Sequence, residues 1–368
     1  MDRPITTEEF HRTISEAVLQ RSTKYSDAYA LSFYWERDDT NAYQDVGHFQ
    51  SMLSTLRLAP AREIVLKAGD VTPGWTVQGA FTKTLNAAKQ TKGRAVVIVH
   101  YAGHGAQGSG DVLNFVECTG GRRLNAMMYM VAHVLPDEGY YLQDHDKVDV
   151  LFVFDCCYSW VACRAPETSQ RVVEVIAATK QEDPMAFSPP RNTITAKLAG
   201  EIKHRERNGH RYVEFAEVIA SLAARPDAVK PPSHGLRAGV MSICLPFSGI
   251  TPVEPQRIQP AMRAVFGVHI SENLTEDTLN SFVSWIRALP ENASMTLEGV
   301  YPTRSTLLVL CGPLSVWNKL NGVFGYSFMA KVTGGNQMRS LVVSPSEPGA
   351  SGLFKENIPP RRDPPTGK

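Results

Sequence analysis

The sequence predicts an α/β protein with a mostly parallel sheet flanked by helices, followed by a smaller α+β module. Short apolar runs, such as residues 95–99 and 150–154, have the length and composition of strands buried on both faces. Stretches with apolar residues at helical spacing separate these runs. A proline-rich stretch at residues 249–261 then precedes a second series of strands and helices.

In the first part of the chain, a short amphipathic helix is expected to carry Phe10, Ile14 and Val18 on one face. Strands are expected at residues 29–35, 63–68, 95–100, 148–155, 172–179 and 239–247. Helices are expected to present Val46, Phe49, Leu53 and Leu56 on one face, then Val77, Phe81, Leu85 and Ala88, with two more at residues 195–204 and 215–224. Strands alternating with helices predict a sheet covered on both sides.

The C-terminal part has a different order of elements. Residues 262–334 show strand, helix, strand, strand, helix, strand, which is typical of a ferredoxin-like module. The tail, residues 335–368, is rich in proline, glycine and charge and is expected to be disordered. The predicted divisions are therefore an N-terminal helix (1–24), an α/β domain (25–248), a linker (249–261), the module and the tail.

Composition excludes some classes of partner. Thirty-eight Lys+Arg and 37 Asp+Glu leave a net charge of +1, which gives no general attraction to nucleic acid or to an acidic membrane. The basic run at 203–211 is interpreted as a solvated helix end. No apolar run approaches the roughly 18 residues of a membrane span, and no signal-peptide core is seen. Six cysteines without a pairing rhythm indicate a reducing compartment, so a cytoplasmic location is expected.

Two strand ends carry candidate chemistry. The third expected strand ends in HYAGHG (100–105) and the fourth in DCCYS (155–159). Functional groups gather beyond the carboxyl ends of parallel strands, so His104 and Cys157 are expected to meet at one edge of the sheet. A cysteine nucleophile needs a neighbouring base, because a free thiol is only slightly ionised at neutral pH. Glycines at 103 and 105 would let the backbone approach a substrate carbonyl closely.

Together, the two motifs resemble the catalytic signature of the caspase-like cysteine peptidases. The Asp-x-Cys-x-Ser form is closest to the metacaspase and paracaspase branch, and the separation of the His and Cys matches the roughly 50 residues known for caspases. The resemblance covers about residues 25–247. The C-terminal module more weakly resembles the tails of some fungal caspase-domain proteins. The resemblance implies the caspase-haemoglobinase fold, a cysteine endopeptidase and a role in regulated cell death or stress signalling.

The resemblance also implies roles for single residues. His104 corresponds to the general base and Cys157 to the nucleophile, while the amides of Gly105 and Cys157 correspond to the oxyanion hole. Asp155 corresponds to the acidic residue of the primary specificity pocket. An acidic residue in this pocket implies cleavage after Arg or Lys, because a buried carboxylate favours a charge-assisted partner. Lys180 and Arg191 lie where family members often carry a processing linker, so they are candidate self-processing sites.

Other residues near the motifs are interpreted as structural. Cys156 occupies a slot that is usually Ser or Ala, and His100 ends a buried strand. Trp160 stands where a glycine commonly follows the serine, and Asp111 is a candidate for a second carboxylate in the specificity pocket. No cofactor is required and no metal ligand is assigned. Calcium, which many family members need, stays an alternative without a dense acidic cluster to hold it.

Two other functions stay open. One is a catalytically silent caspase-fold scaffold, in which residues 262–334 bind a partner or self-associate through a sheet edge. The other is a peptidase with non-basic specificity. The partners expected for the peptidase are protein or peptide substrates, with no nucleic acid and no membrane.

Overall fold

The computed structural model describes most of residues 3–332. The residues within this range that lie outside the description are 19–23, 111, 119–120, 137–140, 144, 164–165, 168, 191, 226–229, 253–259, 261, 290–292 and 304. Asp111, Arg191 and the tail for which disorder is expected (335–368) therefore lie outside the described residues. Within the described residues, no helix combines the length and the apolar character that a membrane span requires.

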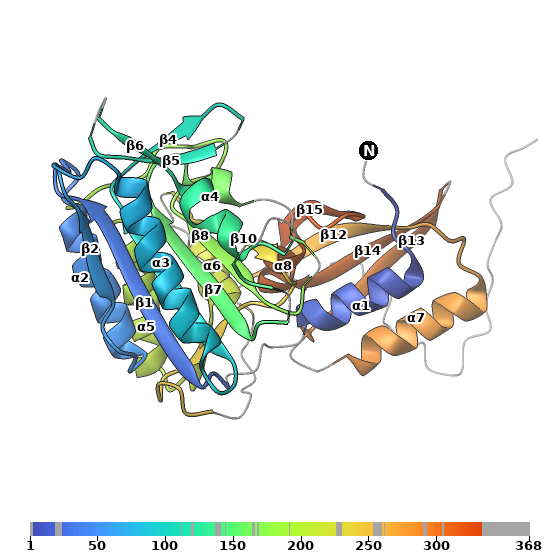
Figure 1. Cartoon of the computed structure of the whole chain (residues 1–368). Coiled ribbons are helices and arrows are strands. Elements are labelled where there is room, and N and C mark those ends of the chain that lie inside the picture. Colours follow the sequence, from blue (N-terminus) through green and yellow to red (C-terminus); the bar gives the residue numbers. More distant parts are fainter. Residues whose placement is uncertain are drawn as a thin grey trace, which may run out of the picture. The chain divides into compact units, whose positions relative to one another are not determined.

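A six-stranded sheet forms the centre of the first part of the chain (Figure 1). Its order is β10-β8-β7-β3-β1-β2, and every neighbouring pair is parallel except β10 with β8. The strands are β1 (Asp27–Trp35), β2 (Arg62–Leu66), β3 (Ala95–Ala102), β7 (Val148–Asp155), β8 (Val173–Ala177) and β10 (Ser233–Ala238). Every residue of β3 and β7 is buried, as their apolar sequences predict for central strands.

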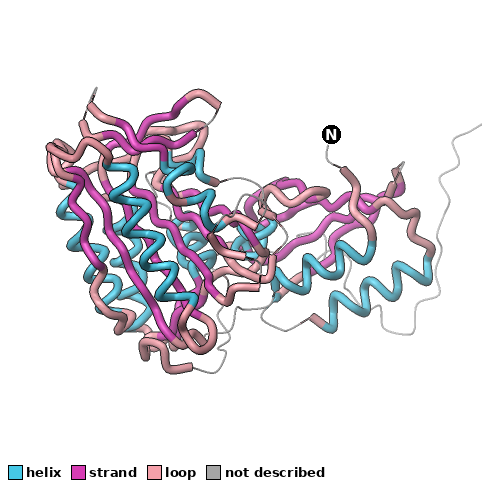
Figure 2. Tube along the Cα trace, in the orientation of Figure 1, coloured by secondary structure: helices cyan, strands magenta, loops and turns pink. Residues whose placement is uncertain are grey.

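Helices cover both faces of this sheet, as Figures 1 and 2 show. The helix α3 (Pro73–Lys89) packs on the face to which β3 contributes Val97 and Val99. The helices α2 (Ala42–Thr55), α5 (Ile194–Arg207) and α6 (Phe215–Ala224) pack on the opposite face, with Val96 and Ile98. Successive residues of a strand point to opposite faces, so one apolar strand supplies both cores. The α/β class with a mostly parallel, helix-flanked sheet is confirmed.

Two features of this part differ from the sequence prediction. The last strand of the sheet is β10, whereas only Cys244–Pro246 of the expected strand 239–247 forms a strand, β11, paired with β9 (Tyr212–Glu214). The prediction was wrong because β10 reads SHGLRA, whose polar side chains are nonetheless buried and bonded internally. A three-stranded sheet, β4 (His104–Gly108), β5 (Val112–Val116) and β6 (Arg123–Asn125), was not expected; α4 (Ala126–Tyr129) follows it.

The C-terminal part has the predicted order of strands and helices. It contains β12 (Arg263–Ile270), α7 (Glu276–Ala288), β13 (Thr296–Pro302), β14 (Thr306–Pro313), α8 (Leu314–Leu320) and β15 (Tyr326–Val332). The strands form an antiparallel sheet in the order β13-β14-β12-β15. The N-terminal helix α1 (Thr7–Val18) shares its hydrophobic cluster: Phe10 and Ile14 lie in the same core as Phe266 and Phe282.

Candidate active site

The two motifs that the sequence singled out lie on neighbouring strands. β3 and β7 are paired in parallel along their whole length, and Ala102 at the end of β3 lies opposite Asp155 at the end of β7. Just beyond, the amide of Gly103 donates a hydrogen bond to the carbonyl oxygen of Asp155 at 3.3 Å. The chain segments that carry His104 and Cys157 therefore leave the sheet side by side, at the same edge.

Glycines at this edge permit a very close approach of the two segments. Gly103 has a φ of +136°, which lets the chain turn directly from β3 into β4. A Cβ atom at Gly105 would lie 2.0 Å from the carbonyl oxygen of Cys157 and 2.9 Å from Sγ of Cys156. No side chain fits there. The residue after His104 thus packs against the peptide that follows the proposed nucleophile.

This contact predicts the effect of a methyl group at Gly105. In Gly105→Ala, the backbone of Cys156 and Cys157 must shift, since the new carbon would overlap a backbone oxygen. We expect a loss of about 1–3 kcal/mol in the free energy of unfolding and a loss of most peptide hydrolysis. Denaturant unfolding and turnover of an Arg-based peptide measure the two effects. Gly79→Ala in α3 is the control, because its Cβ would meet nothing within 4 Å: it should leave turnover near wild type and, as a change inside a helix, raise the free energy of unfolding by about 0.5–1 kcal/mol.

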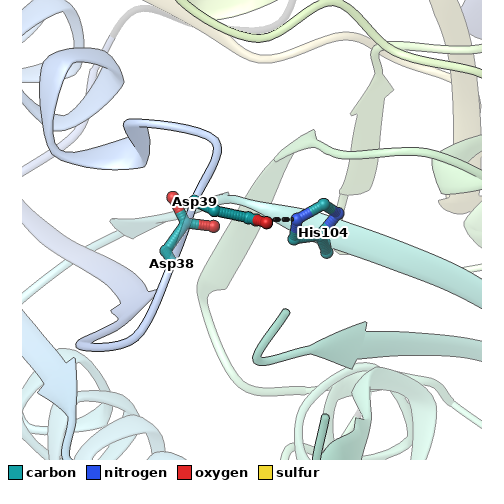
Figure 3. A group of neighbouring side chains, drawn as sticks. All are labelled: Asp38, Asp39 and His104. Atoms are coloured by element: carbon teal, nitrogen blue, oxygen red, sulfur yellow. Dashed lines mark hydrogen bonds and ion pairs between the residues drawn. The ribbon is translucent and has the colours of Figure 1, made fainter. Parts of the chain in front are cut away.

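His104 is the first residue of β4, and its ring contacts a carboxylate that the sequence analysis did not single out. Its Nε2 atom hydrogen-bonds Oδ1 of Asp39, which lies in the loop after β1 (Figure 3). This hydrogen bond is the main reason that the pKa of Asp39 lies below its usual value. The backbone carbonyl of His104 accepts a hydrogen bond from the Tyr101 hydroxyl at 2.8 Å. Both the ring and the backbone of His104 are therefore fixed by neighbours.

The two adjacent cysteines have different surroundings. Cys156 is buried, and burial raises the pKa of its thiol well above the ordinary value, so this thiol stays protonated. Cys157 is partly exposed, and its Sγ accepts a hydrogen bond from the amide of Ala186 at 3.3 Å. The amide of Tyr158 likewise donates to the carbonyl of Pro184 at 2.7 Å. A segment of the loop after β8 therefore lies directly against the exposed thiol.

Asp155 is the last residue of β7, directly before the cysteines, and only 4 % of its surface is exposed. Its Oδ2 accepts hydrogen bonds from the amide and the hydroxyl of Thr195, at 2.8 and 2.7 Å, in the first turn of α5. Its Oδ1 is buried and has no well-formed hydrogen bond among the described residues, although the Ile194 amide and the Thr193 hydroxyl lie close enough to lower the pKa of this carboxyl. A buried carboxylate oxygen without a partner is costly, so this atom is a place where a cationic or hydrogen-donating ligand would be favoured.

A second carboxyl accompanies Asp155, and it is Asp45 of α2. Asp45 accepts a hydrogen bond from the Thr193 hydroxyl and is 3 % exposed. Burial and then the charge of Asp155 raise the pKa of Asp45 to about 8, while burial, opposed by the hydrogen bonds from Thr195, raises the pKa of Asp155 to about 6. The pair thus prefers to hold at least one proton until a cation arrives.

The sequence contained one signal for Asp45. It stands one helical turn before Phe49 on the face that was expected to be buried, where a carboxylate is unusual. Asp111, the candidate for this second carboxyl, lies outside the described residues.

His100 has a structural environment. It is fully buried between Ser32 and Thr195, with hydrogen bonds of 2.9 Å at Nδ1 and 3.0 Å at Nε2. Burial lowers the pKa of its ring to about 3, so the ring is neutral. Its ring stacks on Phe49 with 4.6 Å between the centroids. His100 therefore holds Thr195, and through it Asp155, in place.

One group near the site has the composition of a metal-binding set. Asp38, Asp39 and His104 place one ligand atom each within 4.8 Å of one another. Calcium prefers six or more oxygen ligands, so two carboxylates and an imidazole are not the set that it selects. Both oxygens of Asp38 also accept hydrogen bonds from its own loop. Any ion bound here would compete for Nε2 of His104.

The fold and the two paired motifs define the class of cysteine-type endopeptidases. The family model named caspase domain matches residues 37–242, more than half of the chain, and the chain belongs to this family. The resemblance is thus confirmed at the level of the family, and protein substrates follow from it. A search of curated proteins gives no match.

Proposed function

We propose that the protein is a metacaspase-like endopeptidase that cleaves after Arg or Lys, with Cys157 as nucleophile and His104 as general base. The observation that carries the specificity is the buried carboxyl pair, in which Oδ1 of Asp155 has no well-formed hydrogen bond among the residues that the structure describes. A guanidinium or ammonium group would give this oxygen a charge-assisted hydrogen bond and balance the negative charge of the pair. Regulated cell death or stress signalling in the cytoplasm is the role that the resemblance supports.

The chemistry follows from the positions of the motifs. The thiol proton of Cys157 passes to His104, and the thiolate attacks the carbonyl carbon of the scissile peptide bond. The amides of Gly105 and Cys157 donate hydrogen bonds to the oxyanion of the tetrahedral intermediate. His104 then gives its proton to the leaving amine, and an acyl-enzyme forms on Cys157. Water, deprotonated by His104, hydrolyses this thioester and restores the thiol.

A peptide library that varies the residue before the cut tests the proposed specificity. We expect cleavage after Arg and Lys, since only these side chains bring a permanent cation to Asp155. Cleavage after acidic residues would contradict the role of the carboxyl pair, and cleavage after apolar residues would show that the pair stays protonated and serves the fold.

The loop after β8 also supports self-processing. The amide of Ala186 lies on Cys157, so the uncut segment occupies the place where a substrate backbone would approach. Lys230 holds this segment through its Nζ, which donates to Oδ1 of Asp183 at 2.9 Å and to the carbonyl of Met185 at 2.6 Å. The candidate cut sites, Lys180 and Arg191, stand on either side of the segment. A cut at either would free one end of it.

Self-processing predicts a specific pattern of fragments. Purified wild-type protein should yield two fragments, each about half of the chain, since both candidate bonds lie near the middle of 368 residues. Lys230→Gln should accelerate the cut because the clamp on the segment is lost. Gel electrophoresis over time measures both, with Cys157→Ala as the control that stays intact. A single intact band in the wild type and in Lys230→Gln would dismiss self-processing.

We also propose that residues 262–334 are a ferredoxin-like module that binds a partner or self-associates. Its strand order and the split β-α-β-β-α-β sequence support this assignment. At the ends of its sheet, β13 and β15 offer edges to which a further strand could pair.

A further inference from the structure

The loop between β1 and α2 is shaped by Asp38. One oxygen of this side chain, Oδ2, accepts hydrogen bonds from the amides of Thr40 and Ala42, each at 3.0 Å, and the Thr40 hydroxyl donates to both oxygens at 2.9 and 2.7 Å. Asn41 follows with a φ of +60°. Asp38 thereby satisfies backbone amides at the start of α2 that no helical carbonyl could reach. These hydrogen bonds hold the loop in one conformation, which fixes the direction of Asp39.

The direction of Asp39 is toward His104. Figure 3 shows its carboxylate facing the ring, and the hydrogen bond joins Oδ1 to Nε2. The pKa of Asp39 lies below its usual value, so the carboxylate is ionised at neutral pH and only accepts. Nε2 therefore carries the proton of a neutral ring, and Nδ1 is left with the lone pair.

Stability alone does not account for this contact. The side chain of Asp39 is 65 % exposed and that of His104 is 27 % exposed. Exposed ion pairs contribute little to folding, because water screens the charges and two side chains lose freedom. The same end of β1 has another such pair, Glu36 with Lys67 at 2.9 Å, in which Glu36 also accepts a hydrogen bond from the amide of Ala68. Asp39 differs from Glu36 because its partner is His104, the proposed general base, and not a lysine.

We propose that Asp39 is a positioning residue for His104, so that the site works as a Cys-His-Asp triad. Asp39 accepts the Nε2 proton, keeps the tautomer in which Nδ1 takes the thiol proton of Cys157, and balances the charge of the imidazolium that results. No atom of Asp39 touches the substrate. This role rests on the proposed function, because it needs His104 to act as the base.

Asp39→Ala and Asp39→Asn, with Glu36→Gln as the matched control, test the role. We expect Asp39→Ala to lower kcat by roughly 10- to 100-fold with KM nearly unchanged, a smaller effect than loss of the base itself. Asp39→Asn keeps an acceptor at Oδ1 without the charge, so its kcat should lie between those of Asp39→Ala and the wild type. The rate of Cys157 alkylation by iodoacetamide at pH 7 should fall in parallel with kcat. Glu36→Gln should change neither, and the melting temperature should fall at most slightly, and to a similar extent, in all three, because both carboxylates have a lowered pKa but are largely exposed.

A double-mutant cycle with His104→Ala separates the positioning role of Asp39 from the proposed function, in which His104 is the base. If Asp39 acts through His104, Asp39→Ala has no further effect in the His104→Ala background. Wild-type kcat in Asp39→Ala would show a surface ion pair and overturn the positioning role. A fall in kcat without a fall in alkylation would place Asp39 on the substrate and overturn it as well. Unchanged turnover and alkylation in His104→Ala would instead contradict the proposed function itself.

Discussion

Cys157→Ala should abolish hydrolysis of Arg- and Lys-based fluorogenic peptides, and His104→Ala should reduce it by at least roughly 10³-fold. The first change removes the proposed nucleophile, and the second removes the proposed base, without which a thiol is mostly protonated at neutral pH. Initial rates at saturating peptide measure both effects. Neither change should unfold the protein, because both side chains are partly exposed.

Cys156→Ala is the matched control for this prediction. It removes an identical thiol one residue away, but that thiol is buried and stays protonated. We expect turnover within a few-fold of wild type and a stability loss of about 1 kcal/mol from the small cavity. Retained turnover in Cys157→Ala together with loss in Cys156→Ala would reverse the assignment of the two cysteines.

Asp155→Asn and Asp45→Asn should each lower kcat/KM for Arg peptides by roughly 10²- to 10⁴-fold, because each would remove a carboxylate from the pair that is proposed to bind the substrate cation. In the wild type, KM for Arg peptides should fall as the pH rises from about 6 to about 8, since the pair loses its shared proton over that range. A peptide with Gln in place of Arg has no cation and should show no such pH dependence. An equal pH dependence for both peptides would contradict the carboxyl pair as the recognition site.

The same carboxyl pair is expected to destabilise the folded protein as the pH rises, whereas it is expected to bind Arg peptides more tightly. The folded-state pKa of both carboxyls is raised, so the folded protein keeps protons that the unfolded chain releases near pH 4. Stability from this source is therefore present at low pH and is lost as the pH rises toward 8. Asp45→Asn removes the penalty while keeping an acceptor for Thr193. Its melting temperature should exceed that of the wild type by roughly 2–4 °C or more at pH 8 and by less at pH 5.

Asp70→Asn is the control for the sign of this effect. Hydrogen bonds from Thr76 and Thr72 lower the pKa of Asp70, so it contributes stability above its unfolded pKa. Its replacement should lower the melting temperature slightly at pH 8. A melting temperature of Asp45→Asn below the wild type at pH 8 would show that the carboxyl of Asp45 is ionised and well bonded in the folded protein.

The sequence predicted those helices and strands in which the spacing of apolar residues matches the pattern of buried residues in the structure. The apolar run of β7 and the apolar stripe of α6 were placed at the bounds that the structure has, because the sheet buries both faces of one and the core buries one side of the other. β10 and β4 were missed for a common reason. Their sequences, SHGLRA and HGAQG, have no apolar period, and they form strands because a neighbouring strand pairs with them.

The residues of the candidate site show the same distinction between local sequence patterns and contacts made across the fold. His104 and Cys157 were predicted because each belongs to a local motif at the end of an apolar strand. Asp45 and Asp39 were not, because their roles depend on contacts across the fold: Asp45 meets Asp155, and Asp39 meets His104 across 65 residues of chain. No local pattern encodes a contact of this kind, and only the packing of α2 and its preceding loop against the sheet brings it about.

Covalent labelling of Cys157 tests the central claim most directly. Wild-type protein is treated with an Arg-directed chloromethyl ketone peptide, and intact mass followed by peptide mapping locates the adduct. We predict one adduct per chain, on the sulfur of residue 157, with slower labelling in His104→Ala and none in Cys157→Ala. An adduct on another cysteine, or labelling of His104→Ala at the wild-type rate, would contradict a thiolate at 157 activated by the imidazole at 104.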